Sequence, residues 1–368
     1  MKGKQGLVCM GLLLVLSSCS CHTGKQITAS GLQRKDFQTE VNGQHTDLFT
    51  LSNKQGMEVC ITNYGARVVS ILVPDRNGKR EDVVCGFSTI TEYMEQRQNF
   101  GSTVGRYIGR ILNARFTLDG VEYKLVPNNG KSGHISHGGN PGFADRIWKV
   151  EQADTHRVRL SYLSPDGENG FPGNLKVTLV YSLGEDDNAL DLTYEATTDA
   201  PTVLNLSHHS FFNISGNFTK SVEDQQLWVD ADRFTPYDDK KCVTGEYLQV
   251  AGTPLDFRMP HTIGECIDAD HPQLKVVNGY DHTWELNTKG DDTRPAAWVY
   301  DPASGRKMEI FTTEPGMQIY TGNGLKGKMT GKGGIAYPFR SAVCFETMHF
   351  QDSPNQPGFP STVLRDRK

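Results

Sequence analysis

The sequence lacks three features that would each point to a particular class of protein. It has no basic excess, because 38 lysines and arginines stand against 43 acidic residues in 368, and this argues against a nucleic-acid-binding protein. Its longest uncharged apolar run, 5–16, is too short for a transmembrane helix. It has no Cys-x-x-Cys pair, so cysteine spacing indicates no metal site. The chain does have 38 glycines and 17 prolines, and the many turns these predict favour an all-β protein.

The N-terminus has the pattern of an export signal. Two lysines precede an apolar core at 6–16, which ends in Leu-Ser-Ser-Cys19. This order is typical of a secretory signal peptide, and its ending resembles the lipobox of bacterial lipoproteins. An ordinary signal peptide with an accidental cysteine is the alternative. We expect a signal peptide at 1–18, a lipidated N-terminus and flexible tether at 19–36, and an exported protein anchored to a membrane through Cys19, facing the periplasm or the cell surface.

Short alternating apolar segments separated by turn residues fill the rest of the chain. Asp119-Gly120, between runs at 115–118 and 121–125, supplies the positive φ angles of a tight hairpin. One segment, 91–97, is predicted to be helical. Further strands are predicted at 46–53, 57–63, 66–73, 157–163, 175–183, 189–197, 226–229, 296–300, 307–312, 318–321 and 342–347. This spacing predicts a sandwich or barrel, and without a break in composition we expect one large domain at 37–366.

The cysteines of this domain fall into two groups. Cys60, Cys85 and Cys344 lie within apolar alternating runs and are expected to be small buried residues on strands. Cys242 and Cys266 lie in irregular segments. An exported protein could join these two in a disulfide, but the sequence does not decide this, because pairing cannot be deduced from sequence.

Two glycine-rich segments hold polar residues that turns alone do not require. In 101–111, Gly109 allows close approach of the backbone and Arg110 offers a rigid fork of N–H donors. In 135–139, His137 comes directly before two glycines. Taken singly, each segment fits an ordinary loop as well as a binding site.

The adjacent histidines 208 and 209 give a sharper signal. On a strand, neighbouring side chains point to opposite faces, so these two cannot serve one pocket together or form a metal pair. Histidine titrates near neutral pH, which makes one of them a natural proton donor. Glu346 lies within an apolar strand, where a carboxyl group either faces solvent or has its pKa raised by burial toward that of a general base.

Several longer motifs follow one another along 39–364: NYGARVVSILVPDRNG, GRYIGRI, SHGG, NLSHHSFFN, GYDH, EPGMQIYTGN and CFETMHFQDSPNQPGFPSTVL. In content and order they resemble the aldose 1-epimerase family, the galactose mutarotases. The resemblance implies an all-β fold, a large antiparallel β-supersandwich of the galactose mutarotase-like type, with an open sugar cleft. Two positions depart from many relatives, which have asparagine in place of Gly109 and of His208. The first departure is expected to loosen a hydrogen bond to the sugar.

The resemblance also implies a reaction and a site. His209 would be the general acid and Glu346 the general base that interconvert the α and β anomers of a free hexose, such as galactose or glucose. The residues implied to hold the sugar are Gly109, Arg110, His137, Asp281 and Gln318. This chemistry requires no cofactor or metal. We expect a monomeric enzyme of hexose metabolism that binds no nucleic acid. The carboxyl groups near His209, including Asp281, are expected to raise its pKa.

Two other functions fit parts of the same pattern. A non-catalytic carbohydrate-binding lipoprotein could use this scaffold, although it would not need both His209 and Glu346. A glycosidase would require two carboxyl groups flanking the scissile bond, and Asp281 with Glu346 could form that pair. The acidic clusters at 185–187 and 291–292 fit solvated loops better than a structural Ca²⁺ site, which stays the alternative.

Overall fold

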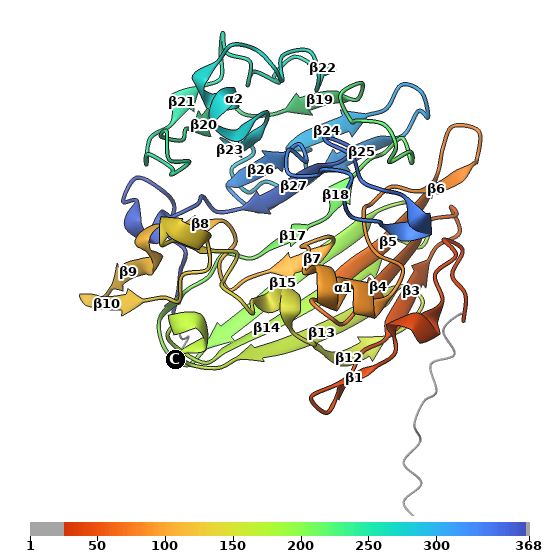
Figure 1. Ribbon diagram of the computed structural model, residues 1–368, viewed down its shortest axis with the longest axis horizontal. Helices are drawn as coiled ribbons and strands as arrows, with labels where there is room; N and C mark the ends of the chain where they lie inside the picture. Colours follow the sequence, from red (N-terminus) through yellow and green to blue (C-terminus); the bar gives the residue numbers. More distant parts are fainter. Residues whose placement is uncertain (1–25, 366–368) are drawn as a thin grey trace, which may run out of the picture.

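Antiparallel strands dominate the computed structural model, which describes residues 26–365 (Figure 1). The predicted signal peptide and Cys19 lie outside the described residues. Two short α-helices occur within 26–365, α1 (Ile90–Gln96) and α2 (Pro272–Val277). No helix in this range is long and apolar enough to cross a membrane.

One half of the molecule is a sandwich of two four-stranded sheets (Figure 1). The first sheet contains β3 (Leu48–Ser52), β4 (Glu58–Thr62), β5 (Arg67–Pro74) and β6 (Arg80–Asp82). The second contains β12 (Lys149–Ala153), β13 (Arg157–Ser164), β14 (Leu175–Leu183) and β15 (Leu190–Thr198). Alternate side chains of both sheets meet in one apolar core, to which Val59, Ile61, Leu160 and Leu179 belong.

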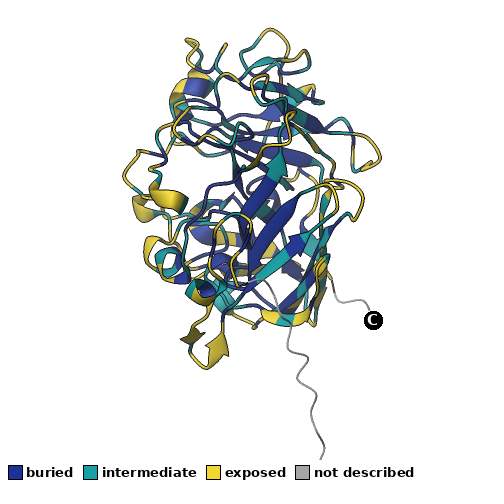
Figure 2. Cartoon of the chain, turned by 90° about the vertical axis from the view of Figure 1, so that its right-hand side faces the viewer, coloured by how far each residue is buried: buried dark blue, intermediate teal, exposed yellow. Residues whose placement is uncertain are grey.

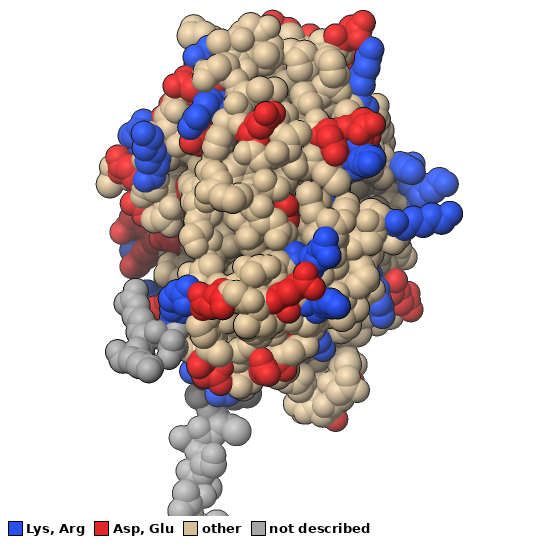
Figure 3. All heavy atoms as spheres, turned by 90° about the vertical axis from the view of Figure 1, so that its left-hand side faces the viewer, with Lys and Arg blue, Asp and Glu red and all other residues tan. Residues whose placement is uncertain are grey.

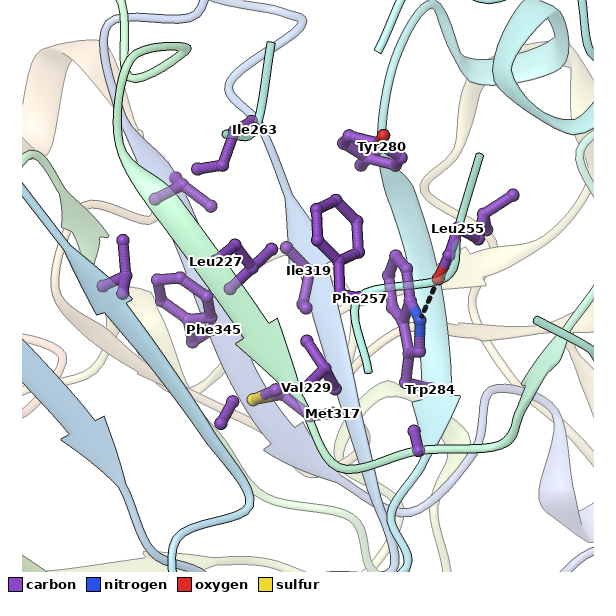
Figure 4. Close-up of a cluster of buried hydrophobic side chains, with 14 of the residues drawn as sticks. Leu227, Val229, Leu255, Phe257, Ile263, Tyr280, Trp284, Met317, Ile319 and Phe345 are labelled. Carbon is purple, nitrogen blue, oxygen red and sulfur yellow. Dashed lines mark hydrogen bonds between the residues drawn. The ribbon is translucent and has the colours of Figure 1, made fainter. Parts of the chain in front are cut away.

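The other half packs a six-stranded sheet against a four-stranded one. In spatial order the larger sheet contains β18 (Phe211–Phe212), β27 (Val343–Met348), β26 (Gly316–Tyr320), β23 (Asp281–Glu285), β20 (Arg233–Thr235) and β21 (Leu248–Gln249). The smaller contains β22 (His261–Thr262), β19 (Gln226–Val229), β24 (Ala297–Tyr300) and β25 (Lys307–Ile310). Figure 4 shows the core between them, where Leu227 and Val229 lie near Ile319 and Trp284 donates its indole N–H to the Leu255 carbonyl at 3.0 Å.

Short paired strands complete the structure. The pairs are β1 (Glu40–Val41) with β2 (Gln44–His45), β7 (Ser102–Val104) with β17 (Ser207–His209), β8 (Arg110–Ile111) with β11 (Ile135–Ser136), β9 (Arg115–Leu118) with β10 (Val121–Lys124), and β16 (Thr202–Val203) with β28 (Val363–Leu364). Single 3₁₀ turns lie at Arg34–Phe37, Leu112–Ala114, Gly130–Ser132, Phe143–Asp145, Glu168–Gly170, Lys332–Gly334 and Ser353–Asn355. In Figure 1, β17 runs between the two halves.

The architecture confirms the predicted all-β supersandwich. Buried residues concentrate on the strands and exposed ones on the connecting loops (Figure 2). Cys60, Cys85 and Cys344 are buried as expected. Cys242 and Cys266 are both free thiols, so they do not form a disulfide here.

Candidate active site

All seven residues that the resemblance assigns to catalysis or sugar binding line one cavity of about 260 Å³. They are Gly109, Arg110, His137, His209, Asp281, Gln318 and Glu346. The same cavity is lined by residues that the sequence did not single out: Gln98, Asn99, Ser136, Phe211, Tyr320, Met348 and Gln351. Segments more than 200 residues apart therefore meet in one site.

His209 reaches the cavity from β17. It is buried, its ring stacks on Phe211 with the centroids 5.1 Å apart, and His137 approaches its edge at 5.6 Å. His208 lies on the other face of the strand, as alternation predicts. There its Nε2 is 2.7 Å from the Ser210 hydroxyl and its ring packs near Tyr181. Only one of the two histidines can therefore touch a ligand in the cavity.

Glu346 reaches the cavity from β27 for a similar reason. Val343 and Phe345 point into the core between the two sheets of their half, so Glu346 points to the opposite face. The antiparallel register places it directly across from Gln318, which in turn lies across from Thr283. The core thus fixes which face of β27 the carboxyl group occupies.

His209 and Glu346 form a buried pair, with Nε2 and Oε1 3.3 Å apart. Burial lowers the pKa of His209 well below 6.5 and raises the pKa of Glu346 well above 4.5, with the Asp281 carboxyl adding to the rise. The expectation that nearby carboxyl groups raise the pKa of His209 is therefore wrong, because loss of hydration outweighs their attraction. Both shifts favour the uncharged forms, a protonated Glu346 and a neutral His209, so the pair holds one proton in total, and a base role for Glu346 would require that proton to move to His209.

Asp281 and Gln318 are joined by hydrogen bonds on the floor of the cavity. Gln318 donates from Nε2 to Oδ1 of Asp281 at 2.6 Å, and its Oε1 accepts from the hydroxyl of Thr283. Burial raises the pKa of Asp281, while Arg110 and Gln318 oppose that rise. The network holds the Asp281 carboxyl as an acceptor facing the cavity.

The β8–β11 pair positions three more of these residues: Arg110 begins β8, Gly109 directly precedes it, and His137 directly follows β11. Arg110 donates to the Lys241 carbonyl at 3.0 Å, and the Gly109 carbonyl accepts from the His137 backbone N–H at 2.9 Å. Burial and the charge of Arg110 lower the pKa of His137 to about 4, so its imidazole is neutral at neutral pH. A neutral imidazole can both donate and accept, which suits a sugar hydroxyl.

The first arginine of the GRYIGRI motif, Arg106, has a structural role. Its buried guanidinium donates to backbone carbonyls that include Pro172 and Gly173 and to the hydroxyl of Ser164 at 2.6 Å. It therefore holds the turn between β13 and β14 against the β7 segment. Of the two arginines four residues apart, Arg106 therefore stabilises the fold and Arg110 lines the cavity.

The acid–base pair could also hold a metal ion together with Cys344. Ligand atoms of His209, Cys344 and Glu346 lie within 4.8 Å of one another, and within 26–365 no other group of three such residues does so. A metal there would occupy the atoms of the acid–base pair. In the acidic cluster at 185–187, Lys54 lies 2.7 Å from Glu185 and 3.4 Å from Asp186, so a lysine already offsets its charge.

Comparison with known proteins places the chain. The family model described as aldose 1-epimerase matches residues 47–367. The chain belongs to the aldose 1-epimerase family. It is 40% identical over 318 residues to galactose mutarotase from Bos taurus, covering 86% of this chain and 89% of that protein. It is 35% identical over 319 residues to aldose 1-epimerase from Escherichia coli K12, covering 87% and 90%.

Solved structures agree with the family assignment. An aldose epimerase homologue from C. elegans superposes with a TM-score of 0.80 at 30% identity, covering 88% of this chain and 95% of that one. Galactose 1-epimerase from Lactobacillus acidophilus gives a TM-score of 0.76 at 28% identity, with coverages of 89% and 94%. The prediction of a carbohydrate epimerase with the mutarotase fold is thus confirmed.

The face on the side of β8 and β9 also suits an uncharged substrate. In Figure 3 acidic and basic side chains alternate around a largely uncharged centre. No field of one sign covers this face, and a neutral sugar needs none. Members of the aldose 1-epimerase family would recognise such a ligand by directed hydrogen bonds.

Proposed function

We propose that this protein is a mutarotase that opens and recloses the ring of a free hexose such as galactose or glucose, with Glu346 as base and His209 as acid. The observation that carries the proposal is the 3.3 Å contact between His209 Nε2 and Glu346 Oε1 at the wall of the cavity. The anomeric oxygen and the ring oxygen of a hexose are bonded to the same carbon. An acid and a base that act on both must therefore lie side by side.

The reaction is a pair of reciprocal proton transfers. With the single proton of the pair on His209 and Glu346 ionised, Glu346 takes the proton of the anomeric hydroxyl while His209 gives its proton to the ring oxygen, and the C1–O5 bond breaks to leave the open-chain aldehyde. Rotation about C1–C2 presents the other face of the carbonyl. Ring closure then reverses both transfers and gives the other anomer. No covalent intermediate with the enzyme is required.

The remaining lining residues are proposed to hold the sugar. Arg110 offers N–H donors, Asp281 a carboxyl acceptor, and neutral His137 one of each. Gln318 touches Asp281 directly and keeps that carboxyl oriented. All seven assigned residues come from one chain, so a monomer would contain the complete proposed site.

The rival functions fit this geometry less well. A retaining or inverting glycosidase uses two carboxyl groups on either side of the bond to be cleaved. Here Glu346 contacts His209, and Asp281 is engaged with Gln318. A non-catalytic binder would have no use for a buried acid–base pair.

Polarimetry of freshly dissolved α-galactose tests the proposal. The purified protein should speed the approach to the equilibrium rotation. Glu346→Gln keeps the shape of the side chain but cannot accept the proton, so kcat should fall by roughly 10²–10⁴-fold while sugar still binds. A variant with near-wild-type rates would remove Glu346 from the role of base. Reducing sugar released from a disaccharide would instead indicate a glycosidase.

We also propose that the enzyme is exported and held on a membrane by a lipid on Cys19. The support is the sequence alone: two lysines, an apolar core at 6–16 and Leu-Ser-Ser before the cysteine. The stretch at 20–34, polar and small, would give the domain a flexible tether.

A further inference from the structure

Gln351, in the segment that follows β27, fills a space left by the absence of a side chain at Gly109. A Cβ placed on Gly109 would lie 2.6 Å from Cγ of Gln351 and 3.4 Å from Cε of Met348. Gly109 also has a φ angle of +74°. A side chain at position 109 and Gln351 in its present position therefore exclude each other.

The backbone holds the two residues together. The N–H of Asp352 donates to the carbonyl of Arg110 at 2.8 Å, and the Asp352 carboxyl accepts from the N–H of Leu112 at 2.9 Å. Gln351 is buried at 5% exposure and still lines the cavity. Its amide thus enters the sugar site from a fixed main chain.

The hydrogen-bond network decides which end of this amide is available. Gln318 donates to Asp281, so its Oε1 is the end that faces Gln351. Gln351 therefore turns its Nε2 toward Gln318 and donates to the hydroxyl of Tyr237 at 2.7 Å. Among the described residues, none donates to Oε1 of Gln351, and an amide oxygen in a polar cavity is an acceptor with an unused lone pair.

We propose that Gln351 is a specificity-determining residue: its Oε1 accepts a hydrogen bond from one hydroxyl of the bound hexose, in a cavity that its side chain can enter because position 109 carries no side chain. The inference rests on the proposed function. It replaces the expectation that Gly109 merely loosens a contact, because the contact passes to another residue. A buried acceptor that loses its donor is penalised, so sugars that lack that hydroxyl are turned over poorly.

The test compares galactose with its 2-, 3-, 4- and 6-deoxy derivatives in wild type and Gln351→Met. Methionine keeps the length of the side chain and removes the acceptor. We expect kcat/KM for galactose to fall by about 3- to 10-fold, mainly through KM. In wild type, each deoxy sugar should have a lower kcat/KM than galactose. For one of them this difference should disappear in Gln351→Met, and for the other three it should persist. Gln152→Met, at an exposed position in β12, is the matched control and should change nothing.

A second comparison keeps the inference testable if Gln351→Met folds poorly. Gly109→Asn alone should impair sugar binding, because the new side chain meets Gln351. The same change in a Gln351→Ala background should be tolerated and should restore part of the lost kcat/KM. Equal penalties for every deoxy sugar in both proteins, or simple additivity of the two substitutions, would overturn the role of Gln351. A wild-type protein inactive on every hexose would instead refute the proposed function.

Discussion

The difference between His208 and His209 depends only on strand alternation. His209 faces Glu346, while His208 lies against Ser210 and Tyr181 on the other side of β17. We expect His209→Asn to lower kcat by roughly 10²-fold or more, because the ring oxygen loses its proton donor. His208→Asn should have a mild effect on the mutarotation rate.

Melting temperatures of both variants provide the control for this prediction, since either histidine is buried enough to affect folding. Equal kinetic losses in two equally stable variants would contradict the assignment of the two faces.

The buried pair also predicts the pH dependence of kcat/KM. The working enzyme has one proton shared between His209 and Glu346. At low pH a second proton disables the base, and burial opposes this by lowering the pKa of His209; at high pH the last proton is lost, and burial opposes this by raising the pKa of Glu346. We therefore expect a bell whose limbs do not fall at the ordinary values of about 4.3 for glutamate and 6.5 for histidine.

The two limbs belong to the coupled pair and not to single residues. Initial rates of mutarotation at low substrate concentration, measured over the full stable range, would trace them. A plateau confined to the interval between the ordinary values would show that burial does not control the pair.

At the scale of elements, Arg106 is the clearest test of how the short strands are held. Its guanidinium serves several acceptors at once, among them the carbonyls of Pro172 and Gly173 and the hydroxyl of Ser164. A lysine ammonium cannot match this planar array. We expect Arg106→Lys to lower the free energy of unfolding by roughly 2–3 kcal/mol.

Urea denaturation would measure this loss, with Arg115→Lys, at an exposed position of β9, as the control. If both substitutions lower the free energy of unfolding by the same amount, the hydrogen bonds of Arg106 contribute no more to stability than an exposed arginine does.

The longer strands could be predicted because each has a buried side or a diagnostic turn. The hairpin β9–β10 is one example: Asp119 and Gly120 both adopt positive φ, as the Asp-Gly pair predicts. The strands β7, β8 and β11 are two or three residues long, too short for any periodicity to register. Helix α2 escaped for the same reason, since only Pro272 at its first turn marks its start.

The residues of the site also differ in how far the sequence could predict them. Strand alternation indicated that only one of His208 and His209 could face a given pocket, and it left Glu346 either facing solvent or buried. The resemblance to the family assigned the roles to His209 and Glu346 and supplied their partners. Gln351 lies within the last of the family motifs but was assigned no role, because it lies outside a regular strand and matters only through its contact with Gly109. Such a contact depends on how two distant segments approach, which no local pattern encodes.

At the scale of the whole molecule, the proposed lipid anchor determines where the protein is located, and the domain that carries the active site is independent of it. Cys19→Ala should abolish lipid labelling and leave the precursor unprocessed at that site. The mutarotase activity of the domain should be unaffected, because every residue lining the cavity lies beyond residue 97. Metabolic labelling with a fatty acid, followed by membrane fractionation, would test this. Wild-type protein that is soluble and unlipidated in its native host would refute the anchor.

The enclosure of His209 and Glu346, which are 6% and 4% exposed, has a consequence for proton traffic. In the proposed cycle the proton that Glu346 removes from the anomeric oxygen returns to that oxygen, and the one that His209 lends to the ring oxygen comes back. Each turnover ends with the enzyme protonated as it began. The pair therefore needs no relay to bulk water, and buffer species have no step to assist. A buried site that would slow a hydrolase, which must exchange protons with water, therefore suits a reaction in which no net proton enters or leaves the site.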